Sequence, residues 1–168
     1  SNCRFWRRLF SRLALTEIWL RKMTEKVDVL FINPGDRKQI YQDLGDEFCA
    51  IEPPVFAGLF ATYVRKKGHT AAIIDGPAWF MSAQEIVDQA LNDYQANLIV
   101  LVVYGNQPSA STQNMSSAGK IAELLRQASP DTKVMITGTH ASALPERTMR
   151  EETIDFVCDG EGPATIVK

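Results

Sequence analysis

Short, nearly continuous apolar runs that alternate with helical patterns are the feature that most limits how this chain can fold. The runs occupy residues 27–33, 70–75, 97–104, 133–137 and 155–158. A strand with apolar side chains on both faces is typical of a parallel sheet that helices cover on both sides. The pattern therefore predicts strands that lie side by side and point in the same direction.

Helical patterns fill the segments between these runs. The first runs from Pro54 to Gly68, residues suited to the start and the end of a helix. Its apolar side chains are expected to be buried: Val55, Phe56, Leu59, Phe60, Tyr63 and Val64. The second begins at a capping box formed by Ser82 and Glu85, the third covers about 111–128, and a short fourth opens at Pro145. Since parallel neighbours need crossovers of this length, we expect a doubly wound α/β fold with a five-stranded parallel sheet.

The charge is divided unevenly along the chain. Residues 1–26 hold seven basic and two acidic groups, whereas residues 27–168 hold 11 basic and 18 acidic groups. A leading segment of +5 thus precedes a domain of -7, although the net charge is only -2. The acidic domain has no general field that would attract nucleic acid, so we expect no nucleic-acid partner.

The leading segment has the pattern of a basic amphipathic helix over residues 3–22. Such a helix could bind a membrane surface or a partner, or could simply pack on its own domain or be an upstream extension foreign to the native fold. We therefore expect an N-terminal extension over 1–26 and one domain over 27–168. The three cysteines lie far apart, which provides neither a disulfide framework nor a metal knuckle, and indicates a reducing cytoplasm.

The loops that follow the strands are where a doubly wound sheet binds its ligands. After the third run, Tyr104 opens a segment rich in hydroxyl and amide groups that extends to Asn114. Such groups ahead of a helix start suit a phosphate or a polar nucleotide tail. Glycines follow the fourth and fifth runs, where they would let the backbone approach a large flat ligand closely. His140 could contact a ligand or a metal there, or be an ordinary loop residue.

Several alternative chemistries lack their residues. A receiver domain needs acidic residues where Asn33 and Tyr104 end their strands, and no GxxxxGK[ST] phosphate loop is present. No nucleophile with its base and no set of metal ligands can be assigned. We therefore predict neither catalytic nor metal-binding residues in this chain.

A set of short motifs in a fixed order resembles one known family. The motifs are Asn33-Pro34, Glu52-Pro53-Pro54 with Gly58-Leu-Phe-Ala61, Lys67-Gly-His69, Gly138-x-His140 with Leu144-Pro-Glu146, and Asp155-Phe-Val-Cys-Asp-Gly-Glu-Gly162. Together they resemble the N-terminal cobalamin-binding domain of cobalamin-dependent radical S-adenosylmethionine enzymes. That family includes the anaerobic magnesium-protoporphyrin IX monomethyl ester cyclase, an oxidoreductase, and several methyltransferases. The resemblance covers residues 27–168 and implies a flavodoxin-like fold.

The resemblance implies that a corrin ring lies across the carboxyl edge of the sheet. The nucleotide tail would reach down among the loops after the third, fourth and fifth strands. The residues expected to meet the tail are Tyr104, Gly105, Ser109, Ser111 and Thr112. Those expected to line the ring or the tail are Gly138, Thr139, His140, Gly160, Glu161 and Gly162.

Two family motifs are missing from this sequence. The DxHxxG motif, whose histidine takes the lower face of cobalt in many relatives of the fold, has no counterpart in the nearest register, Asp36 to Tyr41. The resemblance therefore implies a base-off cobalamin with water or no protein ligand beneath the metal. The CxxxCxxC motif that would hold a [4Fe-4S] cluster is also absent.

The missing cluster motif implies that the iron-sulfur cluster and S-adenosylmethionine belong to a C-terminal partner domain outside this chain. By itself the chain would bind cobalamin without catalysing a reaction. The parent would be a methyltransferase or an oxidative cyclase. The alternative is a stand-alone α/β module that binds another nucleotide or serves as a regulatory docking domain.

Overall fold

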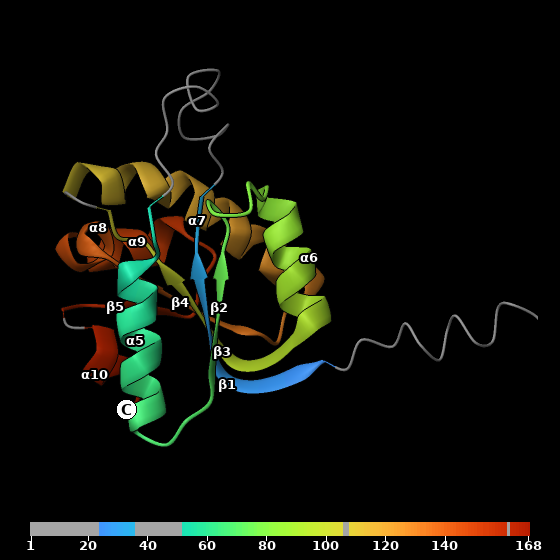
Figure 1. Cartoon of the computed structure of the whole chain (residues 1–168). Coiled ribbons are helices and arrows are strands. Elements are labelled where there is room, and N and C mark those ends of the chain that lie inside the picture. Colours follow the sequence, from blue (N-terminus) through green and yellow to red (C-terminus); the bar gives the residue numbers. More distant parts are fainter. Residues whose placement is uncertain (1–23, 36–51, 106–107, 161) are drawn as a thin grey trace, which may run out of the picture.

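A five-stranded, all-parallel sheet forms the centre of the molecule in the computed structural model, which describes residues 24–35, 52–105, 108–160 and 162–168. The strands lie in the order β2-β1-β3-β4-β5 (Figure 1). Their bounds are β1 Glu25–Asn33, β2 Ala71–Asp75, β3 Tyr94–Val102, β4 Lys133–Thr137 and β5 Phe156–Cys158. This is the flavodoxin-like strand order. Successive strands are added on one side of β1 and then, from β3 onward, on its other side, so the order of the strands reverses between β1 and β3. The predicted doubly wound α/β fold is confirmed.

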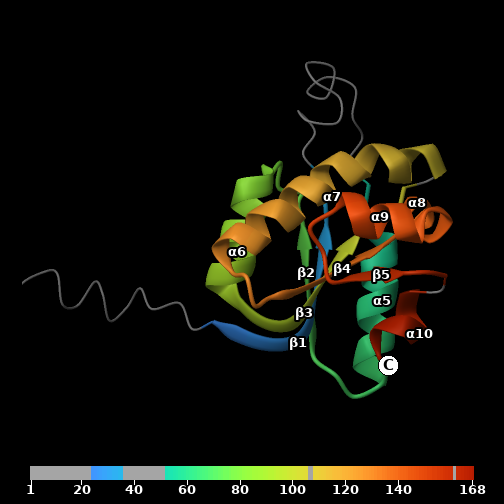
Figure 2. The same ribbon diagram turned by 180° about the vertical axis from the view of Figure 1, so that it is seen from behind.

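Helices cover both faces of the sheet (Figures 1 and 2). Their bounds are α5 Val55–Lys66, α6 Ala83–Asp93, α7 Pro108–Ala128, α8 Thr139–Ala143, α9 Pro145–Glu151 and α10 Gly162–Ile166. The helices α6 and α7 pack on one face, and α5 and α10 pack on the other. Alternate side chains of β1 serve the two faces, since Leu30 and Ile32 join the first cluster and Phe31 joins the second.

The predicted capping box at the start of α6 is confirmed, and α7 packs an apolar stripe on the sheet. The capping box at the start of α6 is formed by Ser82 and Glu85: the Glu85 N–H donates to Ser82 Oγ at 3.3 Å, and the Ser82 N–H donates to Glu85 Oε2 at 2.8 Å. The core residues of α7 recur at helical spacing: Met115, Ala118, Ile121, Ala122 and Leu125.

The predicted inward face of α5 is wrong in part. Val55, Phe56 and Leu59 are exposed, and the helix turns Ala57 and Ala61 toward the sheet beside Phe60 and Val64. A stripe that includes alanine lets the helix axis lie close to the strands. Because both stripes are apolar, the spacing in the sequence could not decide between them.

The structure also corrects several boundaries. The strand β3 starts at Tyr94, directly after α6 ends at Asp93, and α7 starts at Pro108, so part of the predicted loop up to Asn114 is helical. The short helices α8 and α10 were not predicted. The expected N-terminal amphipathic helix lies outside the described residues. Within the described part of the chain, no helix combines the length and the apolar character needed to cross a membrane.

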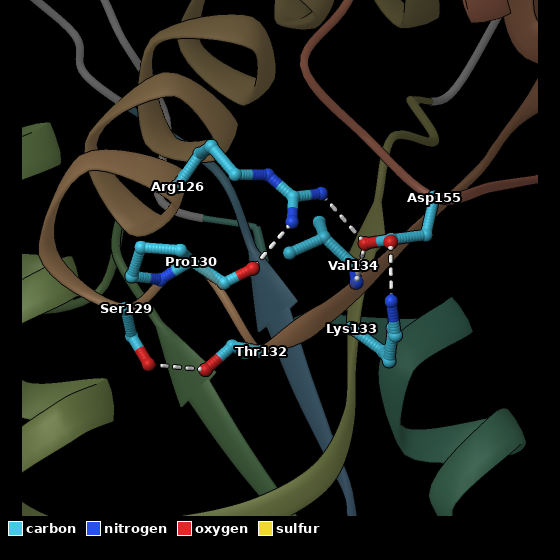
Figure 3. Close-up of polar contacts among 7 residues, drawn as sticks. All are labelled: Arg126, Ser129, Pro130, Thr132, Lys133, Val134 and Asp155. Carbon is cyan, nitrogen blue, oxygen red and sulfur yellow. Dashed lines mark hydrogen bonds and ion pairs between the residues drawn. The ribbon is translucent and has the colours of Figure 1, made fainter.

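A network around Asp155 joins the amino ends of β4 and β5 to the end of α7 (Figure 3). The carboxylate accepts hydrogen bonds from Arg126 Nη2 at 2.8 Å, Lys133 Nζ at 2.9 Å and the Val134 N–H at 3.0 Å. Burial of the side chain, which is only 15% exposed, opposes its ionisation. The three donors outweigh this effect and hold the pKa of Asp155 below its usual range. The network thus fixes where three elements meet.

Candidate functional site

The candidate site lies at the carboxyl edge of the sheet, where β3, β4 and β5 end. Most of the predicted site residues come together there, although they belong to segments far apart in the sequence. The described ones follow these strands: Tyr104, Gly105, Ser109, Ser111 and Thr112 after β3, Gly138, Thr139 and His140 after β4, and Gly160 and Gly162 after β5. Glu161, also predicted, lies outside the described residues.

Ser111 connects two of these strand exits. Its fully buried hydroxyl donates to the carbonyl oxygen of Val103 at 2.5 Å and accepts from the N–H of His140 at 3.1 Å. Next to it, Thr112 Oγ1 lies 3.0 Å from Nδ1 of the half-buried His140. These bonds hold the first turn of α7 against α8. Ser109 and Thr139 lie nearby with exposed side chains.

Tyr104 forms an aromatic cluster with two residues of α5. Its ring stacks on Phe56, with 4.2 Å between centroids and an 18° angle between planes, and meets Phe60 edge-on at 5.7 Å. The side-chain amide of Asn114 donates to the carbonyl oxygen of Tyr104 at 3.2 Å. The sequence suggested Phe56 and Phe60 only as core residues, so their place at the site was missed.

The glycines at the strand exits allow close backbone packing. A Cβ on Gly138 would overlap the carbonyl oxygen of Val103, and a Cβ on Gly105 would overlap Ala110. A Cβ on Gly162 would lie 2.9 Å from Phe60 Cζ and 3.1 Å from Thr137 Oγ1. A side chain at these positions would therefore displace neighbouring elements.

Gly160 is a different case, because its φ of +96° suits a residue without a side chain. Its N–H donates to Ser142 Oγ at 3.4 Å, and that hydroxyl donates to the carbonyl oxygen of Cys158 at 3.3 Å. The exit of β5 is thereby attached to α8.

Thr137, the last residue of β4, is a site residue that the sequence analysis missed. Its side chain is fully buried, and Oγ1 finds no hydrogen-bond partner in the described part of the chain. Burying a hydroxyl without a partner is unfavourable, so this atom is a candidate hydrogen-bonding group for a ligand at this edge. The signal in the sequence is a hydroxyl that closes an otherwise apolar strand.

The chemistry of this edge suits an organic ligand. It offers aromatic faces, hydroxyl groups and closely packed backbone. Among residues 24–35, 52–105, 108–160 and 162–168, no three His, Cys, Asp or Glu side chains gather as a metal site would require. Aromatic faces beside a few hydroxyl groups suit an organic ligand that has both apolar and polar parts.

A comparison with known families decides the ligand class. A model of the B12 binding domain matches residues 42–168. This chain belongs to the B12-binding domain family. The match includes every predicted site residue and Thr137, and it supports cobalamin as the ligand of this B12-binding domain.

A curated relative gives a more distant comparison for the domain. An uncharacterized methyltransferase of Pyrococcus horikoshii is 29% identical over 114 residues. The aligned region is 67% of this chain but only 23% of the relative. This B12-binding domain thus corresponds to a minor part of that protein.

Proposed function

We propose that this chain binds base-off cobalamin as the N-terminal module of a radical S-adenosylmethionine enzyme, a methyltransferase or an oxidative cyclase. The observation that carries the cobalamin part is the B12-binding match, which includes Thr137, whose buried hydroxyl has no hydrogen-bond partner among the described residues. The sequence from Asp36 to Tyr41 has no histidine, which supports a cobalt with water or no protein ligand beneath it.

The proposal for the parent enzyme has separate support. The ordered motifs resemble those of cobalamin-dependent radical enzymes, and the relative described as a methyltransferase is much longer than the aligned region. The [4Fe-4S] cluster and S-adenosylmethionine would belong to a C-terminal partner domain. A CxxxCxxC motif in the reading frame beyond Lys168 would support this parent, and a stop codon in its place would contradict it.

In the proposed complex, the corrin ring would lie across the carboxyl edge and the nucleotide tail would pass among the exits of β3, β4 and β5. Thr137 Oγ1 would form a hydrogen bond with the tail, and Gly138 and Gly162 would keep the backbone close beside it. Ser111 positions His140 by accepting its backbone N–H. When bound, cobalamin supplies a cobalt centre that can carry a methyl group.

Cobalamin binding is tested directly by gel filtration of the chain after incubation with hydroxocobalamin. We expect the corrin absorbance to elute with the protein and to differ in wavelength from that of free hydroxocobalamin, because binding changes the axial ligands and the surroundings of the ring. Elution of all corrin in the small-molecule fraction would contradict the proposal. Co-elution of other nucleotides instead would favour the alternative, a nucleotide-binding module.

The role of Thr137 is tested by Thr137→Val, which removes the hydroxyl but keeps the shape. We expect about fivefold to tenfold weaker binding of cobalamin, the size of one lost hydrogen bond. The melting temperature should stay the same or rise, because the variant no longer buries an unpartnered hydroxyl. Binding of cobinamide, which lacks the nucleotide tail, should not change.

Thr148→Val is the matched control. Thr148 is also buried, but its Oγ1 donates to the carbonyl oxygen of Leu144 at 2.9 Å. This variant should lose stability and keep its affinity for cobalamin. If Thr137→Val lowered stability and left affinity unchanged, the hydroxyl would not contact the tail.

A further inference from the structure

Two large aromatic residues project from the turn between β2 and α6. The side chain of Trp79 is 78% exposed and that of Phe80 is 64% exposed. We call residues 76–81 the aromatic turn. Single exposed apolar residues are common on protein surfaces, whereas two exposed aromatic residues in succession can provide a binding surface.

The backbone of the aromatic turn is held in an unusual conformation. Phe80 has a φ of +53°, in the left-handed region that a bulky side chain rarely adopts. The Phe80 N–H donates to the Pro77 carbonyl oxygen at 3.3 Å, and the Met81 N–H donates to that of Gly76 at 3.0 Å. Glycine would adopt this backbone more easily. An exposed phenylalanine in this backbone conformation is therefore a candidate for a functional role.

The aromatic turn is attached to the exit of β1. The Gly76 N–H donates to the carbonyl oxygen of Asn33 at 3.2 Å, and the Asn33 side-chain amide donates to Asp75 Oδ1 at 2.9 Å. Pro77 packs so closely on Gly35 that a Cβ on Gly35 would overlap the ring of Pro77. The turn therefore lies at the carboxyl edge beside the strand where the sheet reverses its order (Figure 1).

We propose that Trp79 and Phe80 form an apolar wall that contacts the edge of the corrin ring on the β2 side of the site. This inference rests on the proposed cobalamin binding. Neighbouring strands lie about 4.8 Å apart, and a corrin ring is much wider than that. A ring whose tail enters near β4 would cover several strand exits, and since doubly wound sheets bind ligands where the strand order reverses, between β1 and β3, it would extend toward the aromatic turn. The groups on its rim are methyl groups and neutral amides, which suit aromatic faces.

The test compares cobalamin with cobinamide, which shares the ring but lacks the tail. Trp79→Ala should weaken the binding of both corrinoids by the same factor, at least about tenfold, as is typical of an aromatic residue truncated at a binding surface. Thr137→Val should weaken only the binding of cobalamin. Oxidative footprinting of Trp79, read by mass spectrometry, should show protection by either corrinoid.

Phe80→Gly separates a binding role from a structural role. We expect this variant to bind both corrinoids more weakly while its melting temperature rises by about 2 °C, since glycine relieves the unfavourable φ. Met149→Ala is the control, because Met149 is also an exposed large apolar residue but lies on α9. It should keep full affinity.

The results distinguish this inference from the function on which it rests. If the unmodified chain binds both corrinoids, and Trp79→Ala and Phe80→Gly bind them equally well, the wall is disproved and the proposed function stands. If these two variants lost affinity for cobalamin and kept it for cobinamide, the wall would also be disproved, because the residues would then contact the nucleotide tail and not the ring. If the unmodified chain binds no corrinoid, both proposals fail.

Discussion

Replacing Gly138 with alanine is expected to lower the melting temperature by at least about 5 °C and to abolish retention of cobalamin on gel filtration. The added Cβ would overlap the carbonyl oxygen of Val103 and lie 3.2 Å from Ser111 Oγ. The obstacle is main chain, so a change of side-chain rotamer cannot relieve it. The ends of β3 and β4 must move apart, which disturbs the bonds from Ser111 to Val103 and His140. Thermal unfolding and gel filtration measure the two effects.

Gly58→Ala is the matched control for Gly138→Ala. Gly58 lies within α5, and a Cβ there would meet nothing within 4 Å. Alanine favours the helix by up to about 1 kcal/mol, so this variant should be slightly more stable and should still bind cobalamin. If Gly138→Ala behaved in the same way, the close packing at the exit of β4 would have no role in stability or binding.

The second large effect is expected for Asp155→Ala, which should cost roughly 2–4 kcal/mol of stability and lower the melting temperature by about 5–10 °C. The substitution leaves the Val134 N–H and Arg126 Nη2 without the acceptor that both share. It also removes the bond that attaches Lys133, at the start of β4, to the residue before β5. Urea or thermal unfolding at pH 7 measures the loss.

The pH dependence provides an independent check on Asp155. The pKa of this carboxyl in the folded chain lies below its ordinary value of 3.8. Its contribution to stability is therefore complete above that value and is lost as the pH falls through the folded-state pKa. The difference between the unmodified chain and Asp155→Ala should be constant at neutral pH and should shrink below pH 3.8.

Glu123→Ala is the control for Asp155→Ala. Glu123 pairs with Lys120 at 2.7 Å, but both side chains are nearly half exposed, and such pairs contribute little. This variant should change the stability by less than about 1 kcal/mol. An equal loss in both variants would mean that general charge effects, and not the Asp155 network, stabilise the meeting of β4, β5 and α7.

The sequence was sufficient to predict the sheet because each strand depends on local composition. The predictions that failed concern features that tertiary packing or a weak local signal determines, namely the inward face of α5 and the start of α7. Both stripes of α5 are apolar, and only contact with the sheet selects the one with Ala57 and Ala61. The start of α7 at Pro108 was missed because hydroxyl and amide residues have a weak helix propensity, although proline is a favourable first residue.

The candidate site was predictable as a set of loops and less so as a set of contacts. The topology of a parallel sheet brings the exits of β3, β4 and β5 to one edge, so their polar and glycine residues could be grouped from the sequence. Thr137 was missed because one threonine in an apolar strand resembles an ordinary β-branched residue. Its importance depends on the absence of a partner within the described structure, a property that spacing cannot reveal.

The central place of β1 has a consequence for synthesis of the chain. This strand pairs with β2 and β3, which follow it by about 40 and 70 residues, and its side chains Leu30, Phe31 and Ile32 are completely buried. A ribosome makes β1 before its partners, so one backbone edge of β1 stays unpaired until β2 has emerged and the other until β3 has emerged. During that interval the unpaired apolar strand can associate with other molecules. Chaperones, or rapid pairing of β1 with β3, would protect the nascent chain from aggregation.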